Sequence, residues 1–538
     1  MPTLHGKNVA LRFEDQAKYA PLLALLPKSK LLPDPRDGYP TLIVNHGLEE
    51  HLVFRNLGIT SVPNPLRNPA VYSWPGTFTP MPHQIDTAEF LTLHRKCFVF
   101  NQQRTGKTMS ALWAADYLMQ QGAIKKALIV TTISTMRDVW EEAVFNHLSY
   151  RNSAVLHGSR ARRLKLLDPS TTPNIDFYII NHDGIEVIFD ELQARTDIDL
   201  VIVDEASYLR SAGTGRYKLM EKLIATSIPV HPRRLWLMTG TPVPNAPTDA
   251  WGLTKLVSPD RIPKYFGRFK DMTMSQITPY KWVPKHDAFT IAFDAMQPAI
   301  RIKKADVIKN LPPLTWQYRE VELTNEQLKA YRQMHAAFVM QDRDGSSVSA
   351  VNAADKVNKL RQISTGCYKA PDGEYHELDY SNRYKVLKGC IAEAGEAAKI
   401  IIFVPFKGIL RSLTERLRGD GFTCEFVNGD VSATARSRIF NAFKTEVNPQ
   451  ILLAHPRVAS HGLELAVSSD IIWYAPYFSF EEFDQANARI ASGMQKNAMT
   501  IVMLHATKLE RDIYTVLKSK ERGQNAILDL YKRELNDE

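Results

Sequence analysis

The sequence predicts an α/β protein with two tandem parallel-sheet lobes, helical insertions and a small N-terminal α+β domain. Short apolar runs alternate with helical stretches in residues 79–256 and again in residues 396–505. A parallel sheet covered by helices on both faces produces this alternation. With 538 residues, the chain is also too long for one hydrophobic core.

The apolar runs give five expected strands in each alternating set. Leu200-Val-Ile-Val203, for example, is a continuous apolar run, as in a strand that is buried on both faces. The first set comprises residues 96–101, 127–131, 176–180, 200–203 and 235–238. The second set comprises residues 399–404, 423–427, 450–454, 470–474 and 500–504.

The segments outside the two sets are less regular. Residues 1–78 are rich in proline and short apolar runs, and they form a first domain. Residues 257–395 read mostly as helix with proline-rich interruptions, so we expect helical insertions and the connection between the lobes there. Residues 506–538 hold seven Lys/Arg and seven Asp/Glu at helical spacing, which predicts a charged terminal helical extension.

The composition is that of a soluble globular protein, with 44% hydrophobic and 23% charged residues. No apolar run approaches the length of a membrane span, and the N-terminus lacks the apolar core of a signal peptide. The four cysteines lie far apart without metal-ligand spacing, so we expect buried, reduced thiols. These features predict a cytoplasmic protein without a membrane partner, and a monomer is the default expectation.

The charge of the chain favours a polyanionic partner, since the net charge is +9. Residues 259–320 hold eleven Lys/Arg against six Asp/Glu. Aromatic residues are interleaved with these charges: Tyr265, Phe266, Phe269, Tyr280 and Trp282. Such a segment suits a nucleic-acid backbone. A helical insertion whose aromatic residues form its core explains the pattern equally well, and both interpretations stay open.

One short stretch has the pattern of a phosphate-binding loop. Asn101-Gln-Gln-Arg-Thr-Gly-Lys-Thr108 lies between an expected strand and a helical pattern that begins at Lys107. This arrangement directs backbone N–H groups and a positive helix end toward phosphate. Lys107 would reach the β- and γ-phosphates, and Thr108 would bind Mg²⁺. Asn101 occupies the position at which the usual phosphate-loop pattern has its first glycine. The residues expected to bind the nucleotide here are Arg104, Thr105, Gly106, Lys107 and Thr108.

A second motif strengthens the nucleotide interpretation. The apolar run of residues 200–203 ends in Asp204 and Glu205. Carboxylates at the carboxyl end of a buried strand lie where an open α/β sheet holds its ligand. We expect Asp204 to hold Mg²⁺ through water and Glu205 to orient or deprotonate the attacking water. Taken together, the motifs predict a site for ATP and Mg²⁺.

These motifs and their order resemble the superfamily-two helicases, and within them the compact phage or bacterial Swi/Snf-like DNA translocases. The resemblance covers residues 80–505 and implies two RecA-like lobes. Residues 300–313 are similar to the segment that joins the lobes in this family, and residues 360–364 resemble a helical stretch that is characteristic of it. By this resemblance, Gln84 reads the adenine base.

The resemblance also assigns residues to DNA contact and to coupling between DNA and the nucleotide. Ala127-Leu-Ile-Val-Thr-Thr132, with Trp140 and Glu141 after it, is similar to the family's first DNA-contacting motif, and Tyr178-Ile-Ile-Asn-His182 is similar to the next. Leu237-Met-Thr-Gly-Thr-Pro242 closely matches the coupling motif, and Ser460-His-Gly-Leu-Glu-Leu465 stands where the family contacts DNA through its backbone. The residues assigned in this way are Thr131, Thr132, Asn181, His182, Thr239, Gly240, Thr241, Ser460 and Gly462.

The last motif of the second lobe, residues 485–495, contains Gln485 and Arg489 as expected catalytic residues. Arg489 would act as an arginine finger on the γ-phosphate. Three departures from the family pattern stand out. Ser492 and Met494 replace an arginine and a glycine of the last motif, which implies a missing finger. Ser207 replaces a histidine, and Arg104 replaces a glycine of the phosphate loop.

The resemblance implies a DNA-stimulated ATPase that translocates on duplex, forked or branched DNA. The product would be branch migration, reannealing or displacement of bound proteins, with replication or recombination proteins as further partners. Two alternatives remain. One is a DNA or RNA helicase that separates strands, although no separation hairpin can be read from the sequence. The other is a weakly hydrolysing, ATP-switched DNA-binding protein with a regulatory or anti-defence role. Residues 1–78 faintly resemble the substrate-recognition module of annealing helicases, or they form a cap on the first lobe.

Overall fold

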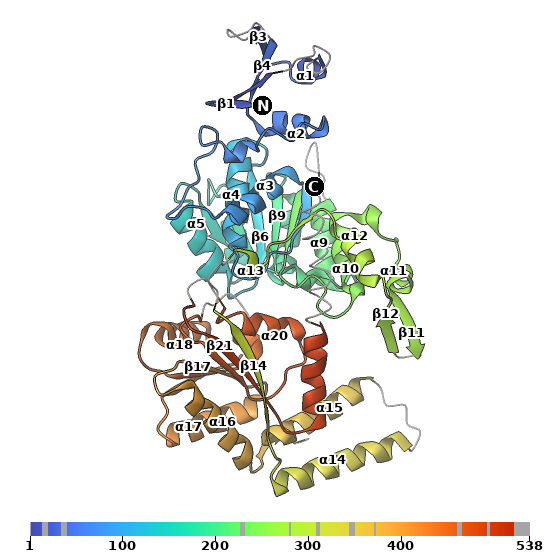
Figure 1. Cartoon of the computed structure of the whole chain (residues 1–538), viewed down its shortest axis with the longest axis vertical. Coiled ribbons are helices and arrows are strands. Elements are labelled where there is room, and N and C mark those ends of the chain that lie inside the picture. The colour runs from blue at the N-terminus through green and yellow to red at the C-terminus, as the bar shows by residue number, and fades with distance from the viewer. Residues whose placement is uncertain are drawn as a thin grey trace. The chain divides into compact units, whose positions relative to one another are not determined.

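The computed structural model divides the chain into two compact units, with the border after Val307 (Figure 1). It describes residues 2–12, 20–33, 40–225, 232–278, 281–307, 312–343, 350–370, 373–459, 465–491 and 495–520. Unit 1 comprises the described residues up to Val307, and unit 2 comprises those from residue 312 to residue 520. Each unit contains one large parallel sheet.

The N-terminal part of unit 1 is a small antiparallel sheet with two helices, which is the α+β arrangement that the sequence predicts. Its elements are β1 (Thr3–His5), β2 (Asn8–Arg12), α1 (Ala20–Leu25), β3 (Lys30–Pro33), β4 (Pro40–Asn45) and α2 (Leu48–Asn56). The strand order is β1-β2-β4-β3. Buried side chains such as Val9, Leu42 and Phe54 form a separate core for this part.

The small sheet is tied to the rest of unit 1 through the residues that follow it. Arg67 forms ion pairs with Asp86 and Glu89, and Asn64 Nδ2 donates a hydrogen bond to Thr92 Oγ1. These three partners lie on helix α3 (Pro82–Leu93). The contacts agree with a cap on the first lobe. They do not address the recognition of a DNA substrate.

The large sheet of unit 1 has seven strands, all parallel. They are β5 (Lys96–Val99), β6 (Lys126–Thr131), β7 (Ser153–Val155), β8 (Phe177–Asn181), β9 (Ile198–Asp204), β10 (Arg234–Met238) and β13 (Ala299–Ile300), in the order β13-β5-β10-β9-β6-β8-β7. Successive residues of each strand enter opposite faces, so that Cys97 and Val99 belong to one core and Phe98 and Phe100 to the other. Burial on both faces explains why these strands read as continuous apolar runs.

Helices cover both faces of this sheet (Figure 1). Besides α3 they are α4 (Lys107–Gln120), α5 (Glu142–His147), α6 (Arg160–Leu167), α7 (Gly184–Val187), α8 (Phe189–Ala194), α9 (Gly215–Ala225), α10 (Ala250–Val257), α11 (Phe266–Thr273), α12 (Ala288–Ala295) and α13 (Lys304–Val307). The core on the Val99 face includes α3, α4 and α5, and the core on the Phe98 face includes α9, α10 and α12. An antiparallel hairpin of β11 (Met274–Thr278) and β12 (Lys281–Pro284) follows α11.

Unit 2 contains a six-stranded parallel sheet in the order β14-β21-β20-β17-β19-β18. Five of these strands are the ones predicted from the second set of apolar runs. They are β17 (Ile400–Phe403), β18 (Cys424–Val427), β19 (Ile451–Ala454), β20 (Asp470–Trp473) and β21 (Met499–His505). The sixth, β14 (Leu314–Glu320), lies at the sheet edge beside β21.

The helices of unit 2 also pack on both faces of its sheet. The elements besides the sheet are α14 (Asn325–Arg343), α15 (Ala350–Thr365), β15 (Cys367–Lys369), β16 (Tyr375–Glu377), α16 (Ser381–Ala394), α17 (Lys407–Gly419), α18 (Ala433–Thr445), α19 (Pro456–Ala459) and α20 (Phe480–Asn487). Helices α16 and α17 contribute to the core around Ile402, and α18 and α20 contribute to the core around Phe403. A helix from Lys508 to Lys520 adds Tyr514 to the second core.

The fold class predicted from the sequence is confirmed: the chain is α/β, with two tandem RecA-like parallel-sheet lobes. The prediction that residues 257–395 are mostly helical is incomplete, because the six strands from β11 to β16 lie in this range. β14 is an edge strand with mostly exposed or half-buried residues, so its sequence lacks the apolar run that marks a central strand. The two-residue strand β13 is too short to give any periodicity.

The cysteines follow the prediction, since Cys97, Cys367, Cys390 and Cys424 are free and buried. Burial raises the pKa of each thiol, which keeps it protonated. In the described part of the chain, no helix is long and apolar enough to cross a membrane.

Candidate nucleotide site

The predicted motifs of unit 1 meet at one edge of its sheet. Five neighbouring strands, β5, β10, β9, β6 and β8, run in the same direction, and a motif follows or ends each of them. In the register of the sheet, Val99 pairs with Met238, Met238 with Asp204, and Thr131 with Asn181. The carboxyl edge of a parallel sheet is where open α/β proteins bind their ligands.

The phosphate loop follows β5 and has the backbone that an anion-binding turn needs. Arg104 and Gly106 both have positive φ angles, 68° and 79°. Helix α4 begins directly after Gly106, at Lys107, so its N-terminal N–H groups and positive dipole end point to the loop. A Cβ on Gly106 would lie only 1.9 Å from Nε2 of Gln84, which, together with the positive φ, explains why this position requires glycine.

Two residues of α3 support the loop. His83 Nε2 is 2.9 Å from the carbonyl oxygen of Thr105, and burial lowers the pKa of His83. The side chain of Gln84 lies against Gly106, and its Oε1 accepts a hydrogen bond from the backbone N–H of Met81. Gln84 therefore lies beside the phosphate loop, and its role in reading the base stays a prediction. His83 is a supporting residue for which no role was expected from the sequence.

Lys107 closes the loop through two hydrogen bonds. Its Nζ donates to the carbonyl oxygens of Asn101 at 2.8 Å and Gln102 at 3.1 Å. Thr108 is the next residue of α4 and is half-buried. The ammonium group and the hydroxyl group therefore stand at the helix start, where phosphate and Mg²⁺ ligands are expected.

The acidic pair ends β9, and three side chains of unit 1 converge on Asp204. Trp140 Nε1 donates to Asp204 Oδ2 at 3.0 Å, and Thr131 Oγ1 donates to the same oxygen at 3.3 Å. His182 Nε2 lies 3.1 Å from the carbonyl oxygen of Asp204. Glu205 adopts a left-handed backbone with φ 53°, which is uncommon for residues other than glycine. The carboxylate of Asp204 is thus held by neutral donors.

These contacts give Thr131 and His182 a different environment from the expected one. Both residues were expected to contact DNA, whereas Thr131 is fully buried and its hydroxyl faces the carboxylate of Asp204. Thr132 is half-buried, and its hydroxyl bonds that of Thr135. Asn181 is buried, and its Oδ1 lies 3.5 Å from Nη1 of Arg163.

Trp140 is a neighbour of the acidic pair whose contact with Asp204 was not expected from the sequence. It lies on a π-helical turn, Met136–Glu141, and it is fully buried. π-helical turns insert an extra residue into a helix and often occur at functional sites. Trp140 follows the 127–132 motif closely, but nothing in the spacing indicates that its indole reaches a carboxylate 64 positions later.

The Thr239-Gly-Thr241 loop follows β10 and adjoins the phosphate loop. A Cβ on Gly240 would lie 3.6 Å from Cγ of Gln103. The N–H of Thr241 donates to Thr239 Oγ1 at 3.1 Å, and both threonines are buried. The loop therefore lies beside the residues that would surround the nucleotide, as the expected coupling role requires.

In unit 2, Gln485 and Arg489 are buried rather than exposed on a helix surface. Gln485 lies on α20, and Arg489 follows its end, where the carbonyl oxygen of Arg489 accepts a hydrogen bond from the N–H of Leu465. Ser460, Gly462, Ser492 and Met494 lie outside the described residues.

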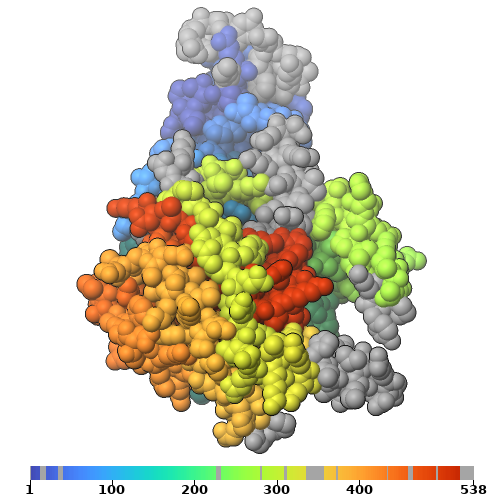
Figure 2. All heavy atoms as spheres, turned by 60° about the horizontal axis from the view of Figure 1, so that its bottom comes forward, coloured from blue at the N-terminus to red at the C-terminus, as the bar shows by residue number. Residues whose placement is uncertain are grey.

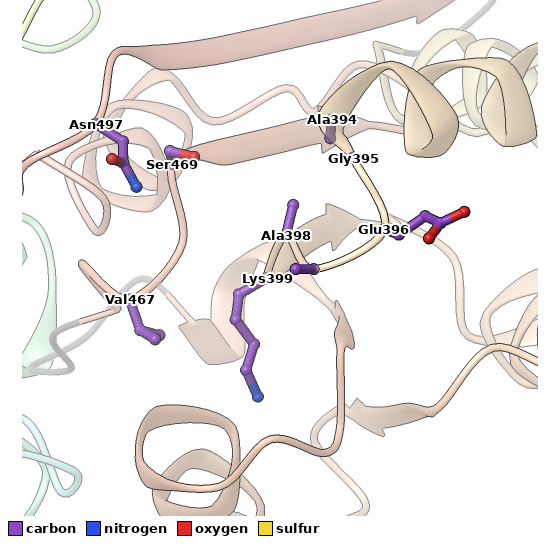
Figure 3. Close-up of a pocket in the computed structure, with 9 residues that line it drawn as sticks. Ala394, Gly395, Glu396, Ala398, Lys399, Val467, Ser469 and Asn497 are labelled. Atoms are coloured by element: carbon purple, nitrogen blue, oxygen red, sulfur yellow. The ribbon is translucent and has the colours of Figure 1, made fainter.

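Gln495 holds the two motif segments of unit 2 together. Its Nε2 donates to the carbonyl oxygens of Ala466, Ser468 and Ile490, at 3.2, 2.8 and 3.2 Å. A hollow beside this cluster is lined by residues 394–399, Val467, Ser469 and Asn497, at the ends where β17, β20 and β21 begin (Figure 3). Gln495 therefore ties the chain that follows the first motif to the interior of the second.

The basic, aromatic segment contains both buried and exposed aromatic side chains. Phe269 is buried, as a core residue is, whereas Phe266 packs edge-on against Trp251 but stays exposed. Tyr265 is 65% exposed and is followed by the exposed cation Arg268. The hairpin and α11 form a projection at the surface, coloured green (Figure 2). Tyr280 lies outside the described residues.

The donor set fits a nucleoside triphosphate with Mg²⁺. Left-handed loop residues and a helix N-terminus supply backbone N–H groups, and Lys107 supplies a cation. A hydroxyl from Thr108 and a carboxylate from Asp204 are oxygen ligands of the kind that Mg²⁺ prefers, with phosphate oxygens and water completing its shell.

Comparisons with known proteins identify the family of this chain. A family model described as SNF2-related domain matches residues 83–369, and one described as helicase conserved C-terminal domain matches residues 382–493. Protein p41 of Acyrthosiphon pisum secondary endosymbiont phage 1 is 23% identical over 475 residues, which cover 84% of this chain and 98% of that protein.

The chain is also similar to part of a much longer protein and to a solved structure. Human chromodomain-helicase-DNA-binding protein 7 is 23% identical over 497 residues, which cover 82% of this chain and only 16% of that protein. The solved SWI2/SNF2 ATPase core of Sulfolobus solfataricus in complex with dsDNA covers 86% of this chain and 97% of its own, with 17% identity and a TM-score of 0.39. Because the SNF2-related model matches more than half of the chain, the chain belongs to the SNF2-related family and carries its helicase-like ATPase domains.

Proposed function

We propose that this protein is a DNA-dependent ATPase that translocates along duplex or branched DNA and remodels it. The observation that carries the proposal is the carboxyl edge of the unit 1 sheet. The phosphate loop, the Asp204-Glu205 pair and the Thr-Gly-Thr loop line up there on adjacent strands. In this proposal, the sites for phosphate, for metal and water, and for coupling are combined on one rigid element.

In unit 1 we assign the nucleotide to the phosphate loop. Lys107 binds its β- and γ-phosphates, and Gln84, beside Gly106, reads the base. Thr108 and Asp204 hold Mg²⁺, which neutralises charge on the phosphates when it is bound. Glu205 orients and deprotonates the attacking water. Arg104, Thr105 and Gly106 shape the loop around the phosphates.

In unit 2 we assign the transition-state cation to Arg489, with Gln485 as its neighbour on α20. Its burial supports this role, because a buried guanidinium is more weakly screened by water than an exposed one. Ser460 and Gly462 contact the DNA backbone in this proposal, together with the half-buried Thr132. Thr239, Gly240 and Thr241 link the DNA groove to the nucleotide.

A second candidate is strand separation, which the β11–β12 hairpin favours. The hairpin projects beyond α11 (Figure 1), and Lys270 Nζ lies 3.6 Å from the ring centre of its Trp282. A protruding hairpin is a device that can split a duplex during translocation. No such hairpin was expected from the sequence, so strand separation needs its own measurement.

The test is ATP hydrolysis by the full chain without nucleic acid and with duplex, forked and single-stranded DNA or RNA. We expect duplex or forked DNA to stimulate hydrolysis more strongly than single strands or RNA do. Lys107→Ala should abolish hydrolysis, because the cation that holds the β- and γ-phosphates is lost. If Lys107→Ala hydrolyses ATP as fast as the wild type, the ATPase proposal is wrong. If no DNA raises the rate, the DNA-dependent part is wrong.

A further inference from the structure

The segment Ala299–Val307, here called the linker segment, runs beside the phosphate loop. Its first two residues form β13 and pair in parallel with β5, Ala299 opposite Phe98 and Ile300 opposite Val99. The backbone N–H of Phe100 donates to the carbonyl oxygen of Ile300 at 2.8 Å. The linker segment thus follows β5 toward the loop that is expected to bind phosphate.

Three more hydrogen bonds continue this pairing into the loop itself. The N–H of Gln102 donates to the carbonyl oxygen of Ile302 at 2.9 Å. The N–H of Ile302 donates to Asn101 Oδ1 at 2.9 Å, and the N–H of Lys304 donates to Gln102 Oε1 at 2.7 Å. Asn101 is 1% exposed, so its bond is shielded from water.

The same two loop residues are the partners of Lys107. Its Nζ donates to their backbone carbonyl oxygens, while their side chains accept from the linker segment. Asn101 and Gln102 therefore connect the phosphate-binding cation to the backbone of Ile302 and Lys304 through a chain of hydrogen bonds. A glycine at position 101, as in the usual phosphate-loop pattern, has no side chain to make the bond to Ile302.

The linker segment is the last part of unit 1, and unit 2 begins at the next residue. The linker segment is therefore the part of unit 1 that the covalent chain joins directly to unit 2.

We propose that Asn101 and Gln102 are positioning residues that couple nucleotide binding to the linker segment, and through it to unit 2. The inference rests on the proposed function. When Lys107 binds phosphate oxygens, its N–H donors are shared with them or withdrawn from the carbonyls of Asn101 and Gln102. The two residues then shift, and their side chains move Ile302 and Lys304. Because coupling between two sites is reciprocal, DNA that engages both units changes nucleotide affinity by the same route.

The first test measures a ratio in the full chain: the affinity for a fluorescent, non-hydrolysable ATP analogue with duplex DNA divided by the affinity without it. Couplings of this kind are typically about 5-fold to 150-fold. We expect Gln102→Ala to reduce the ratio about tenfold or to bring it to one. Gln102→Glu keeps an Oε acceptor for the backbone N–H of Lys304 and should restore the ratio even if the absolute affinity falls.

Thr87→Val is the matched control. Thr87 Oγ1 accepts a hydrogen bond from Asn101 Nδ2, so the variant removes the other bond of the Asn101 amide and leaves its bond to Ile302. We expect this variant to keep the wild-type ratio. If Gln102→Ala and Asn101→Ala both keep the wild-type ratio, the coupling role is refuted while the ATPase proposal stands.

The second test reads the linker segment directly, by hydrogen exchange of the amides of Ile302 and Lys304 with and without the ATP analogue. We expect bound nucleotide to change their exchange clearly in the wild type, and to leave it unchanged in the Asn101→Ala, Gln102→Ala double variant. Exchange in the wild type that does not respond to bound nucleotide contradicts the inference. A wild type that binds no nucleotide contradicts the proposed function instead.

Discussion

Replacing Trp140 by phenylalanine tests whether the buried indole holds the carboxylate to which we assign Mg²⁺. Trp140 Nε1 lies 3.0 Å from Asp204 Oδ2, and the second donor to that oxygen, Thr131 Oγ1, is more distant at 3.3 Å. A hydrogen bond to a charged group contributes about 1.5–3 kcal/mol. Each step of about 1.36 kcal/mol corresponds to roughly a tenfold change in rate. We therefore expect kcat/KM for ATP to fall roughly 10-fold to 100-fold. Mutation of residues that hydrogen-bond to metal ligands lowers metal affinity or activity by about the same factor in other proteins.

The assay is steady-state ATP hydrolysis at a series of Mg²⁺ concentrations. A less firmly held Asp204 should raise the Mg²⁺ concentration needed for half-maximal rate. Trp113→Phe is the matched control, because Trp113 is equally buried and its Nε1 donates to the carbonyl oxygen of Pro75, which belongs to no predicted motif. If Trp140→Phe matches Trp113→Phe in both rate and Mg²⁺ requirement, the reasoning is refuted.

Three further outcomes are expected. Gly106→Ala should abolish binding of a fluorescent ATP analogue in a folded protein, since its Cβ would meet Gln84 Nε2 at 1.9 Å in a left-handed backbone; retained affinity would contradict the assigned loop geometry. Glu510→Gln should lower the free energy of unfolding of unit 2 by about 3–5 kcal/mol in urea titrations, because Arg383, with which Glu510 pairs at 2.7 Å, is left charged and fully buried; a loss below about 1 kcal/mol would refute this. Burial lowers the pKa of His51 to about 4. The neutral ring therefore contributes up to about 3 kcal/mol to the free energy of unfolding, fully above about pH 6.5, and this contribution is lost as the pH falls toward 4. Urea titrations at several pH values should show this loss, and His51→Leu should remove it.

The sequence was sufficient for the parts of the fold that depend on continuous burial. Nine of the ten predicted strands are mainly apolar because both faces of each sheet are covered, and a run of this kind is visible without any structure. The tenth, β18, is an edge strand with two half-buried residues. β14 was missed since an edge strand needs no such run, and it joins its sheet only through long-range pairing, such as that of Leu314 with Met499. The residues around Leu314 do not indicate that the strand pairs with Met499.

In the candidate site, too, some residues could be predicted from local sequence and others could not. Lys107 and Asp204 were predictable because each follows an apolar strand in a local pattern. The indole of Trp140 at Asp204 and the bond from Ile302 to Asn101 join residues 64 and 201 positions apart, and only the folded sheet brings them together. Thr131 was assigned to DNA from its position in a motif, and its burial beside Asp204 became visible only in the structure.

The central claim is ATP-driven movement along duplex DNA. The most direct measurement uses a duplex that carries a short third strand bound in its major groove, together with a forked duplex of the same length. We predict that the wild-type protein with ATP and Mg²⁺ displaces the third strand, that Lys107→Ala does not, and that the two strands of the forked duplex stay paired. Separation of the forked strands would favour a helicase instead. A third strand that stays bound while ATP is hydrolysed would contradict translocation.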